Sequence, residues 1–345
     1  LSGRAGLNSR IGEGPQLVGA TVKLDYFGYK GDVGPFVEGI NHLEATLSPY
    51  YRTNGERWNL QLGVNAMLIT GDSSWIFASP NIAADVQVGK RTQLYVSAGG
   101  QIQSNDVHGG AQVNRYIDFY REVLPARTWL DATVGIRSGI TPDVWLNVFA
   151  GYKITENDVF FVPSYRSMIT SIDGDESKWA NDFVYSGVFQ PDASAFQVGA
   201  ELKYSYRKWL DLSLKGVYHS WTLKEGDFGN YGMEPEDMKP YGRPAVDVNV
   251  DVVVKPLEPL TLTLGYYLGA DRYTRLTRYN DMSGFLDENV KMKNLNDLNL
   301  TASWNINDTF GAYLKLNNLL FQKQELFYGH PLQGFNAMVG ININF

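Results

Sequence analysis

The sequence predicts an all-β transmembrane protein: an antiparallel up-and-down β-barrel of about 14 strands. Three observations predict this fold class. Apolar and polar residues alternate over segments of about ten to twelve residues, short and long connections alternate between these segments, and aromatic residues gather at the segment ends. Because successive side chains of a strand point to opposite faces, the alternation produces one apolar face and one polar face.

The alternation is clearest in two segments, 58–68 and 260–270, where apolar residues occupy the even positions. In 246–254 five valines at even positions oppose Asp247, Asn249 and Asp251. These segments are longer than the usual strand of five or six residues and suit a tilted membrane crossing. Their apolar faces carry no charge, as expected where a mid-bilayer charge costs about 2–4 kcal/mol. We therefore expect the apolar faces to contact lipid and the polar faces to line a lumen.

Aromatic residues at the segment ends match the girdles that flank the apolar band of such barrels. The candidates are Tyr50, Tyr51, Trp58, Trp129, Tyr204, Tyr206, Trp209, Trp304 and Phe310.

Fourteen segments follow this pattern, with boundaries good to about three residues. They are 19–27, 41–52, 57–69, 80–89, 92–103, 128–138, 143–155, 195–206, 209–221, 244–255, 259–271, 296–306, 309–320 and 335–345. Residues 1–18 are expected to be a periplasmic lead-in or a further strand, and residues 19–345 the barrel.

The connections between segments predict the topology. Short connections lie near 53–56, 90–91, 139–142, 207–208, 256–258 and 307–308, and long ones at 104–127, 156–194, 222–243, 272–295 and 321–334. Outer-membrane barrels have short periplasmic turns and long extracellular loops. We therefore expect both termini on the periplasmic side and an even number of strands.

Composition narrows the function classes. The net charge of −7 argues against a nucleic-acid partner, and the absence of cysteine is compatible with an oxidising periplasm. The sequence contains no run of about 18 apolar residues, so no transmembrane helix is predicted.

Catalysis in such a barrel would need a histidine that acts with a serine or an aspartate. Among the four histidines only His219 has a serine neighbour, Ser220. Because adjacent residues of a strand point to opposite faces, these two cannot act together, and no enzyme is expected. We also expect no metal and no cofactor. The acidic run around Asp173 lacks the glycine of an EF-hand loop and is interpreted as solvated.

The last segment, FNAMVGININF, alternates and stops on the aromatic Phe345. It resembles the assembly signal of outer-membrane barrels.

Residues 47–162 resemble a family of TonB-dependent-receptor-like barrels. The resemblance is carried by LSPYYRTNGERWNLQLGVNA, by SPNIAADVQ with QLYVSAGGQIQSND, and by LDATVGIRSGITPDVWLNVFAGYKITENDVFF. The C-terminal NNLLFQKQELFYGHPLQGFNAMVGININF is similar to the last two strands of such receptors. About half of the chain is covered. A full receptor has an N-terminal plug and 22 strands, whereas this sequence is expected to be plug-less, so the resemblance implies the barrel rather than the mechanism.

The alternation assigns a set of charged residues to the lumen. These lumen candidates are Lys23, Glu44, Asp131, Arg137, Lys153, Glu201, Lys203, Asp211, Lys215, Asp247, Asp251 and Lys315. Their signs are mixed, which predicts weak ion selectivity. They are interpreted either as paired residues that solvate the interior or as a substrate path.

Two loops are the other candidate sites. The loop 156–194 carries the aromatic residues Phe160, Phe161, Tyr165, Trp179, Phe183, Tyr185 and Phe189. A loop of this length is usually functional, and we expect either a lumen constriction or a docking surface. In 272–294 Arg272, Arg275 and Arg278 are clustered, which is interpreted as a solvated loop or as a contact to lipopolysaccharide phosphate.

The leading functional hypothesis is a non-catalytic subunit or scaffold of an outer-membrane complex. Its expected partners are other outer-membrane proteins or lipoproteins, outer-membrane lipid and lipopolysaccharide. One alternative is a passive channel for small solutes. The other is TonB-dependent uptake, which needs a plug outside the printed sequence.

Overall fold

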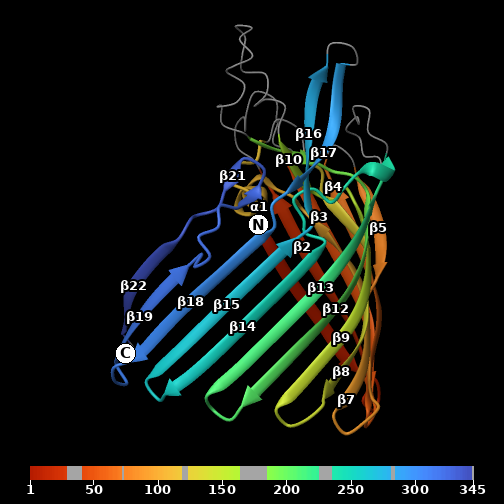
Figure 1. The fold of residues 1–345 in the computed structure, drawn as a ribbon. Helices are drawn as coiled ribbons and strands as arrows, with labels where there is room; N and C mark the ends of the chain where they lie inside the picture. Colours follow the sequence, from red (N-terminus) through yellow and green to blue (C-terminus); the bar gives the residue numbers. More distant parts are fainter. Residues whose placement is uncertain are drawn as a thin grey trace.

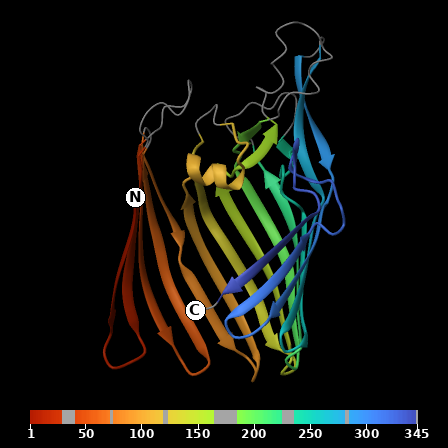
Figure 2. The same ribbon diagram turned by 90° about the vertical axis from the view of Figure 1, so that its left-hand side faces the viewer.

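A computed structural model describes residues 1–28, 41–71, 74–118, 123–163, 185–224, 235–280 and 284–343. One antiparallel sheet of 16 strands dominates it, and Figures 1 and 2 show this sheet curled into an open barrel. The predicted all-β antiparallel architecture is confirmed. Among the described residues, no helix has the length and apolarity needed to span a lipid bilayer.

The predicted segments correspond to fourteen of the sixteen strands of the large sheet; β1 and β5 are additional. The strands of the sheet are β1 (Ser2–Arg10), β2 (Leu17–Phe27), β3 (His42–Asn54), β4 (Trp58–Thr70), β5 (Trp75–Pro80), β6 (Ile82–Gln87), β7 (Thr92–Gln103), β8 (Ala126–Gly139), β9 (Val144–Glu156), β12 (Ala193–Tyr206), β13 (Leu210–Leu223), β14 (Val246–Leu257), β15 (Leu260–Ala270), β18 (Leu295–Asn305), β19 (Phe310–Asn317) and β22 (Asn336–Ile343). Each strand of the sheet pairs with the next in chain order, with four exceptions. β5 and β6 both pair with β4, and hairpins outside the sheet separate β9 from β12, β15 from β18 and β19 from β22. Since β5 and β6 together make one bent crossing, the described chain crosses the sheet fifteen times.

Smaller elements lie beyond the strand ends that carry the long connections (Figure 1). They are α1 (Val107–Val113), η3 (Pro235–Asp237) and three hairpins: β10 (Phe160–Pro163) with β11 (Ser186–Phe189), β16 (Arg272–Asn280) with β17 (Gly284–Met292), and β20 (Glu325–Phe327) with β21 (His330–Pro331). We call this side of the sheet the loop end and the opposite side the turn end.

The strand register aligns residues of one kind in rows across the sheet. Leu214, Val250, Tyr266 and Leu298 are successive cross-strand partners on β13, β14, β15 and β18. The adjacent row holds Lys215, Asn249, Tyr267 and Asp297. Because a shift of one residue would exchange the two faces, the pattern in each strand fixes its register against its neighbours.

The polar face is the concave one. The Ser104 hydroxyl, just after β7, donates to Glu44 Oε2 on β3 at 2.9 Å, and the Tyr95 hydroxyl on β7 donates to Asn147 Oδ1 on β9 at 3.0 Å. Both hydrogen bonds join strands that have at least one other strand between them. Side chains span this distance most readily on the inside of a curved sheet. The apolar residues of the other face are widely exposed, including Leu264 at 38%. This convex face fits the predicted lipid contact.

The N-terminal residues form a further strand, one of the two alternatives expected for residues 1–18, but they place Leu1 on the other side of the sheet from the one expected. β1 pairs with β2 along its whole length, Ser2 opposite Asp25 and Arg10 opposite Leu17, so it adds a crossing before the fourteen predicted ones. Leu1 therefore lies at the loop end, where its ammonium group donates to the Tyr26 carbonyl at 2.7 Å. The C-terminal end of β22 lies at the turn end, as expected, so the two termini lie on opposite sides of the sheet (Figure 1). The number of described crossings is consequently odd. The assembly-signal residue Phe345 lies outside the described residues.

Candidate functional site: the polar wall and the loop-end cap

The lumen candidates lie on the barrel strands, where opposite charges stand next to each other. Lys23 Nζ lies 2.7 Å from Asp25 Oδ2, and Lys203 Nζ lies 2.9 Å from Glu201 Oε1. Two further pairs are direct cross-strand partners, Asp131 with Lys153 and Glu201 with Lys215. Such alternation of sign leaves little net field along the wall.

Aromatic rings on the polar face pack against several of these cations. The Arg137 guanidinium lies 3.9 Å from the centre of the Tyr95 ring, Lys203 Nζ lies 5.0 Å from that of Trp145, and Lys315 Nζ lies 5.3 Å from that of Tyr313. A cation above an aromatic face is stabilised by the ring quadrupole. The remaining lumen candidates, Asp211 and Asp251, lie on β13 and β14.

Asp247 connects three strands near the loop end of this wall. Its carboxylate accepts a hydrogen bond of 2.6 Å from the Tyr267 hydroxyl on β15, and its other oxygen lies 3.4 Å from His219 Nε2 on β13. Trp221 stacks on His219 with 6.3 Å between ring centroids. Within the described part of the chain, no three acidic or histidine residues form a group suited to a metal ion.

Trp129 is not part of the aromatic girdle. It packs against a buried cluster of Met67, Ile69 and Phe77 on the polar face, 5.2 Å from the Phe77 ring. The prediction is wrong because a β-bulge between Thr128 and Leu130 breaks the regular pairing of β8 at this residue. By contrast, the convex-face residues Trp58, Trp209, Trp304 and Phe310 are all exposed at the turn end, as a girdle requires.

The loop end carries its own hydrophobic core, which we call the cap core. It contains Phe160, Val162, Phe189, Ala193, Leu223, Met238 and Tyr241. Phe160 and Phe189 are 1% and 0% exposed, so they hold the β10–β11 hairpin to β13 and to the segment before β14. Burial raises the pKa of the Tyr241 hydroxyl to about 12, which keeps this group neutral.

The burial of Phe160 and Phe189 bears on the aromatic loop predicted at 156–194. These two side chains are not available to a partner. Phe161 packs edge-on against Phe327 of β20 at 4.9 Å, and Tyr185 is exposed. Tyr165, Trp179 and Phe183, as well as Asp173, lie outside the described residues.

Two arginines stabilise the cap core by forming ion pairs. Arg243 donates to both oxygens of the buried Asp158 at 2.9 and 2.8 Å, and its guanidinium lies 4.2 Å from the centre of the Phe160 ring. Arg275 lies 3.6 Å from Asp287 on the facing strand β17 and 4.5 Å from the ring centre of Phe189. Each cation is therefore covered by an aromatic ring and paired with a carboxylate.

Arg272 connects three loops through carbonyl groups. Its side chain is 0% exposed and donates to the carbonyls of Gly242 at 3.3 Å, Lys293 at 3.4 Å and Glu325 at 2.9 Å, and also to that of Leu326. Burial lowers the pKa of this guanidinium. The interpretation of 272–294 as a solvated loop or lipopolysaccharide contact is thus wrong for Arg272 and Arg275, because β16 and β17 form a hairpin whose base is packed. The Arg278 side chain lies outside the described residues.

The cap also joins loops from distant parts of the sheet. Tyr116, between β7 and β8, stacks on His330 of β21 with 4.0 Å between ring centroids and an interplanar angle of 2°. Ser186 of β11 donates its backbone N–H to the Tyr116 carbonyl at 2.9 Å. His330 is buried, and this burial lowers the pKa of its imidazole. The β7–β8 and β19–β22 connections therefore meet above the polar wall, although six strands lie between β8 and β19.

The cap residues Asp158, Arg243, Tyr116 and His330 were not among the predicted site residues. Their contacts join segments remote in sequence, and Asp158 and Arg243 are 85 residues apart. A charge within a loop gives no local signal of such a partner.

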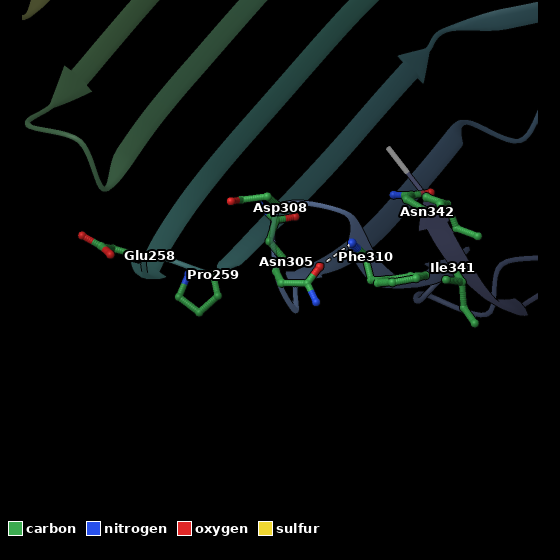
Figure 3. Close-up of a pocket in the computed structure, with 10 residues that line it drawn as sticks. Glu258, Pro259, Asn305, Asp308, Phe310, Ile341 and Asn342 are labelled. Atoms are coloured by element: carbon green, nitrogen blue, oxygen red, sulfur yellow. Dashed lines mark hydrogen bonds between the residues drawn. The ribbon is translucent and has the colours of Figure 1, made fainter. Parts of the chain in front are cut away.

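An open pocket of about 830 Å³ lies at the opposite, turn end (Figure 3). Its walls come from the β14–β15 turn at Glu258 and Pro259, from the β18–β19 turn around Asp308, and from Ile341 and Asn342 of β22. The pocket therefore borders the last strand of the sheet rather than the cap.

Comparison with known proteins gives the class of fold. No protein-family model and no curated protein matches the sequence. Solved structures are similar over all or nearly all of the chain. The outer membrane transporter YddB from Escherichia coli has a TM-score of 0.66 at 10% identity, with 100% of this chain and 54% of that chain covered. The ferric enterobactin receptor PfeA from Pseudomonas aeruginosa has a TM-score of 0.63 at 10% identity, covering 100% and 53%.

The ferripyoverdine receptor of the outer membrane of Pseudomonas aeruginosa has a TM-score of 0.58 at 15% identity, covering 96% of this chain and 45% of that chain. The chain thus has the fold of an outer-membrane β-barrel of the TonB-dependent receptor type. It spans about half the length of the structures it matches. The predicted resemblance is confirmed at the level of the fold, and the plug-less form stays a prediction.

Proposed function

We propose that this chain forms the wall and part of the outer cap of a ligand-uptake receptor in the bacterial outer membrane. The stack of Tyr116 on His330 carries the proposal, because it joins loops from β7–β8 and β19–β22 above the polar wall. A solute that enters between these two loops would displace this contact. Uptake past loops that must move differs from free diffusion through an open pore, so this contact favours a gated route over a passive channel.

The wall below the cap suits an anionic, aromatic ligand. The Arg137 guanidinium on β8 lies 3.9 Å from the centre of the Tyr95 ring, and Lys203 Nζ on β12 lies 5.0 Å from that of Trp145. Cationic side chains bind anionic groups, and aromatic faces pack against planar rings. Two structures of similar fold are receptors for ferripyoverdine and ferric enterobactin, and these chelates are therefore the first ligands to test.

The test measures binding of ferripyoverdine and ferric enterobactin to outer-membrane vesicles that contain the protein, and uptake of radioactive iron by the cells. We expect saturable binding that Arg137→Leu weakens by about tenfold, since the change removes the cation beside Tyr95 on the wall. Lys90→Leu, in the β6–β7 turn at the turn end, is the matched control and should bind normally. Absence of saturable binding, or equal loss in both variants, would contradict the proposal.

A second function is an outer-membrane subunit or scaffold with protein, lipoprotein, lipid and lipopolysaccharide partners. It is supported by the exposed aromatic ring of Tyr185 next to the β10–β11 hairpin. It is weakened by the burial of Phe160 and Phe189, which removes them from any docking surface.

Single-channel recording tests the passive-channel alternative, because a large steady conductance would favour a passive channel over both other functions.

A further inference from the structure

A groove of about 400 Å³ lies between two neighbouring turns at the turn end. One turn joins β3 to β4 and contributes Glu56 and Arg57, and the other joins β6 to β7 and contributes Arg91. The adjoining ends of β4, β6 and β7 form the rest of the wall. This volume falls in the range of sites for small molecules. Neither the cap nor the proposed uptake route uses the groove.

The two arginines of the groove are fixed through their backbones. Gln87 donates its backbone N–H to the Arg57 carbonyl at 2.7 Å, and Gly139 donates its own to the Arg91 carbonyl at 2.9 Å. Both side chains are exposed, and among the described residues neither guanidinium forms an ion pair or a hydrogen bond. Two positive charges are therefore held beside the groove and are available to a ligand.

The groove also carries two carboxylates. Asp85 Oδ2 accepts hydrogen bonds from Asn59 Nδ2 at 3.0 Å and from Gln93 Nε2 at 2.7 Å, so amides rather than cations hold this carboxylate in place. Glu56 is exposed on the turn beside Arg57. The groove therefore presents positive and negative charges that do not pair with each other.

Trp58 fixes the depth of the groove in the membrane. This residue lines the groove and is exposed at the turn end, where the girdle lies. Its indole lies against Gly55 of the same turn, where an added β-carbon would collide with the ring. Because tryptophan concentrates at the level of the lipid head groups, head groups of the adjacent leaflet are within reach of the groove.

The positive charge is specific to this groove. The other pocket at the turn end is lined by the carboxylates of Glu258 and Asp308, and no lysine or arginine is among the described residues that line it (Figure 3). A pair of arginines is thus not a general property of the turns.

We propose that the groove binds the head group of phosphatidylethanolamine, a phospholipid that carries a primary amine. Guanidinium groups bind phosphate oxygens through parallel hydrogen bonds, and a primary ammonium donates hydrogen bonds to carboxylates. The phosphate lies on Arg57 and Arg91, and the ammonium lies on Glu56 and Asp85. The quaternary ammonium of phosphatidylcholine cannot donate, and phosphatidylglycerol has no cation, so both bind more weakly. The site is separate from uptake and holds for either function proposed above.

The first experiment counts the lipids that stay bound to the full chain in native mass spectrometry from a neutral detergent. We expect one retained phosphatidylethanolamine, which Arg57→Gln combined with Arg91→Gln weakens by about tenfold or more. Lys208→Gln is the matched control, because Lys208 precedes the exposed Trp209 in the β12–β13 turn as Arg57 precedes Trp58. Slow hydrogen exchange of the β13 amides verifies folding of each variant. Equal retention by the double variant and the unaltered protein would overturn the proposal.

The second experiment tests the choice of lipid. Glu56→Gln combined with Asp85→Asn should abolish the preference for phosphatidylethanolamine over phosphatidylglycerol and leave binding of phosphatidylglycerol intact. An unchanged preference, or no preference in the unaltered protein, would contradict the assigned head group. Inorganic phosphate as competitor should displace the lipid only in large excess, and displacement at equal concentration would mean that the groove takes a free anion instead. Iron chelates enter neither experiment, so failure here is distinct from failure of the proposed function.

Discussion

Tyr116 and His330 lie face to face, with 4.0 Å between ring centroids, although six strands of the sheet lie between β8 and β19, where their loops leave it. This contact joins two separate loops above the curved sheet. Arg272 reinforces it by donating to the carbonyls of Glu325 and Leu326 within β20 and to that of Gly242.

The closed cap should weaken at low pH. Burial lowers the pKa of His330 below its ordinary value of about 6.5, so the opened cap takes up a proton more readily than the closed one. The contribution of His330 is therefore complete above about pH 6.5 and declines as the pH falls below it. Hydrogen exchange of the amides of β20 and β21, corrected for intrinsic rates, should accelerate between pH 7 and 5. His330→Phe keeps the stack and should remove this dependence, and an unchanged pH profile in that variant would contradict the prediction.

Replacement of Arg272 by methionine should open the cap. The change leaves the buried carbonyls of Gly242 and Glu325 without their donor, at a cost of about 1–3 kcal/mol for each unsatisfied group. We expect faster exchange at β20 and a lower midpoint of local thermal unfolding. Lys291→Met, on the exposed side of the same hairpin, is the control. Equal effects of the two substitutions would show that the hydrogen bonds of Arg272 do not hold the loops of the cap together.

The ion pair of Asp158 with Arg243 should show measurable coupling. Asp158 is buried and receives two bonds from the guanidinium, so Asp158→Asn and Arg243→Leu should each destabilise the cap by about 1–3 kcal/mol. In a double-mutant cycle the coupling should exceed that of the more exposed pair Glu201–Lys203, for which less than about 1 kcal/mol is expected. Coupling energies of the same size in both cycles would be inconsistent with a structural role for the first pair.

The two faces of the sheet should differ in their tolerance of charge. Leu264→Lys places an ammonium group on the convex face and should cost about 2–4 kcal/mol if that face meets the bilayer core. Thr263→Lys, the next residue on the concave face, should cost far less because the charge reaches water. Chemical unfolding of the protein in vesicles measures both. A reversed order would mean that the apolar face does not contact lipid.

Removal of one ring from the cap core should unfold the loop end and spare the wall. Phe189→Ala creates a cavity beside Tyr241 and should cost about 3–5 kcal/mol of local stability. Exchange should accelerate in β10 and β11 and stay slow in β14. Tyr185→Ala, on an exposed residue near the same hairpin, should have a small effect. A global loss of protection would indicate that cap and wall unfold together.

The alternation of apolar and polar residues explains which strands could be predicted from the sequence. All fourteen segments coincide with strands, because a strand between lipid and water must alternate at every second residue. The segment that became β1 was ambiguous, since SGRAGLNSR offers small residues rather than a clear apolar row. The β16–β17 hairpin was expected to be a loop, because RYTRLTRYN and GFLDENVKM show no lipid-facing face. It lies beyond the membrane, where no such face is needed.

The sequence by itself determined fourteen strands of the sheet and which face is polar, because alternation depends on residues one or two positions apart. The lengths of the connections indicated the strand order. Only the tertiary structure decided the cap and the groove at the turn end. Tyr116 meets His330, and Asp158 meets Arg243, through the curvature of the sheet rather than through any spacing in the chain. The groove likewise brings Arg57 and Arg91 together through the pairing of β4 with β6, which no single segment contains.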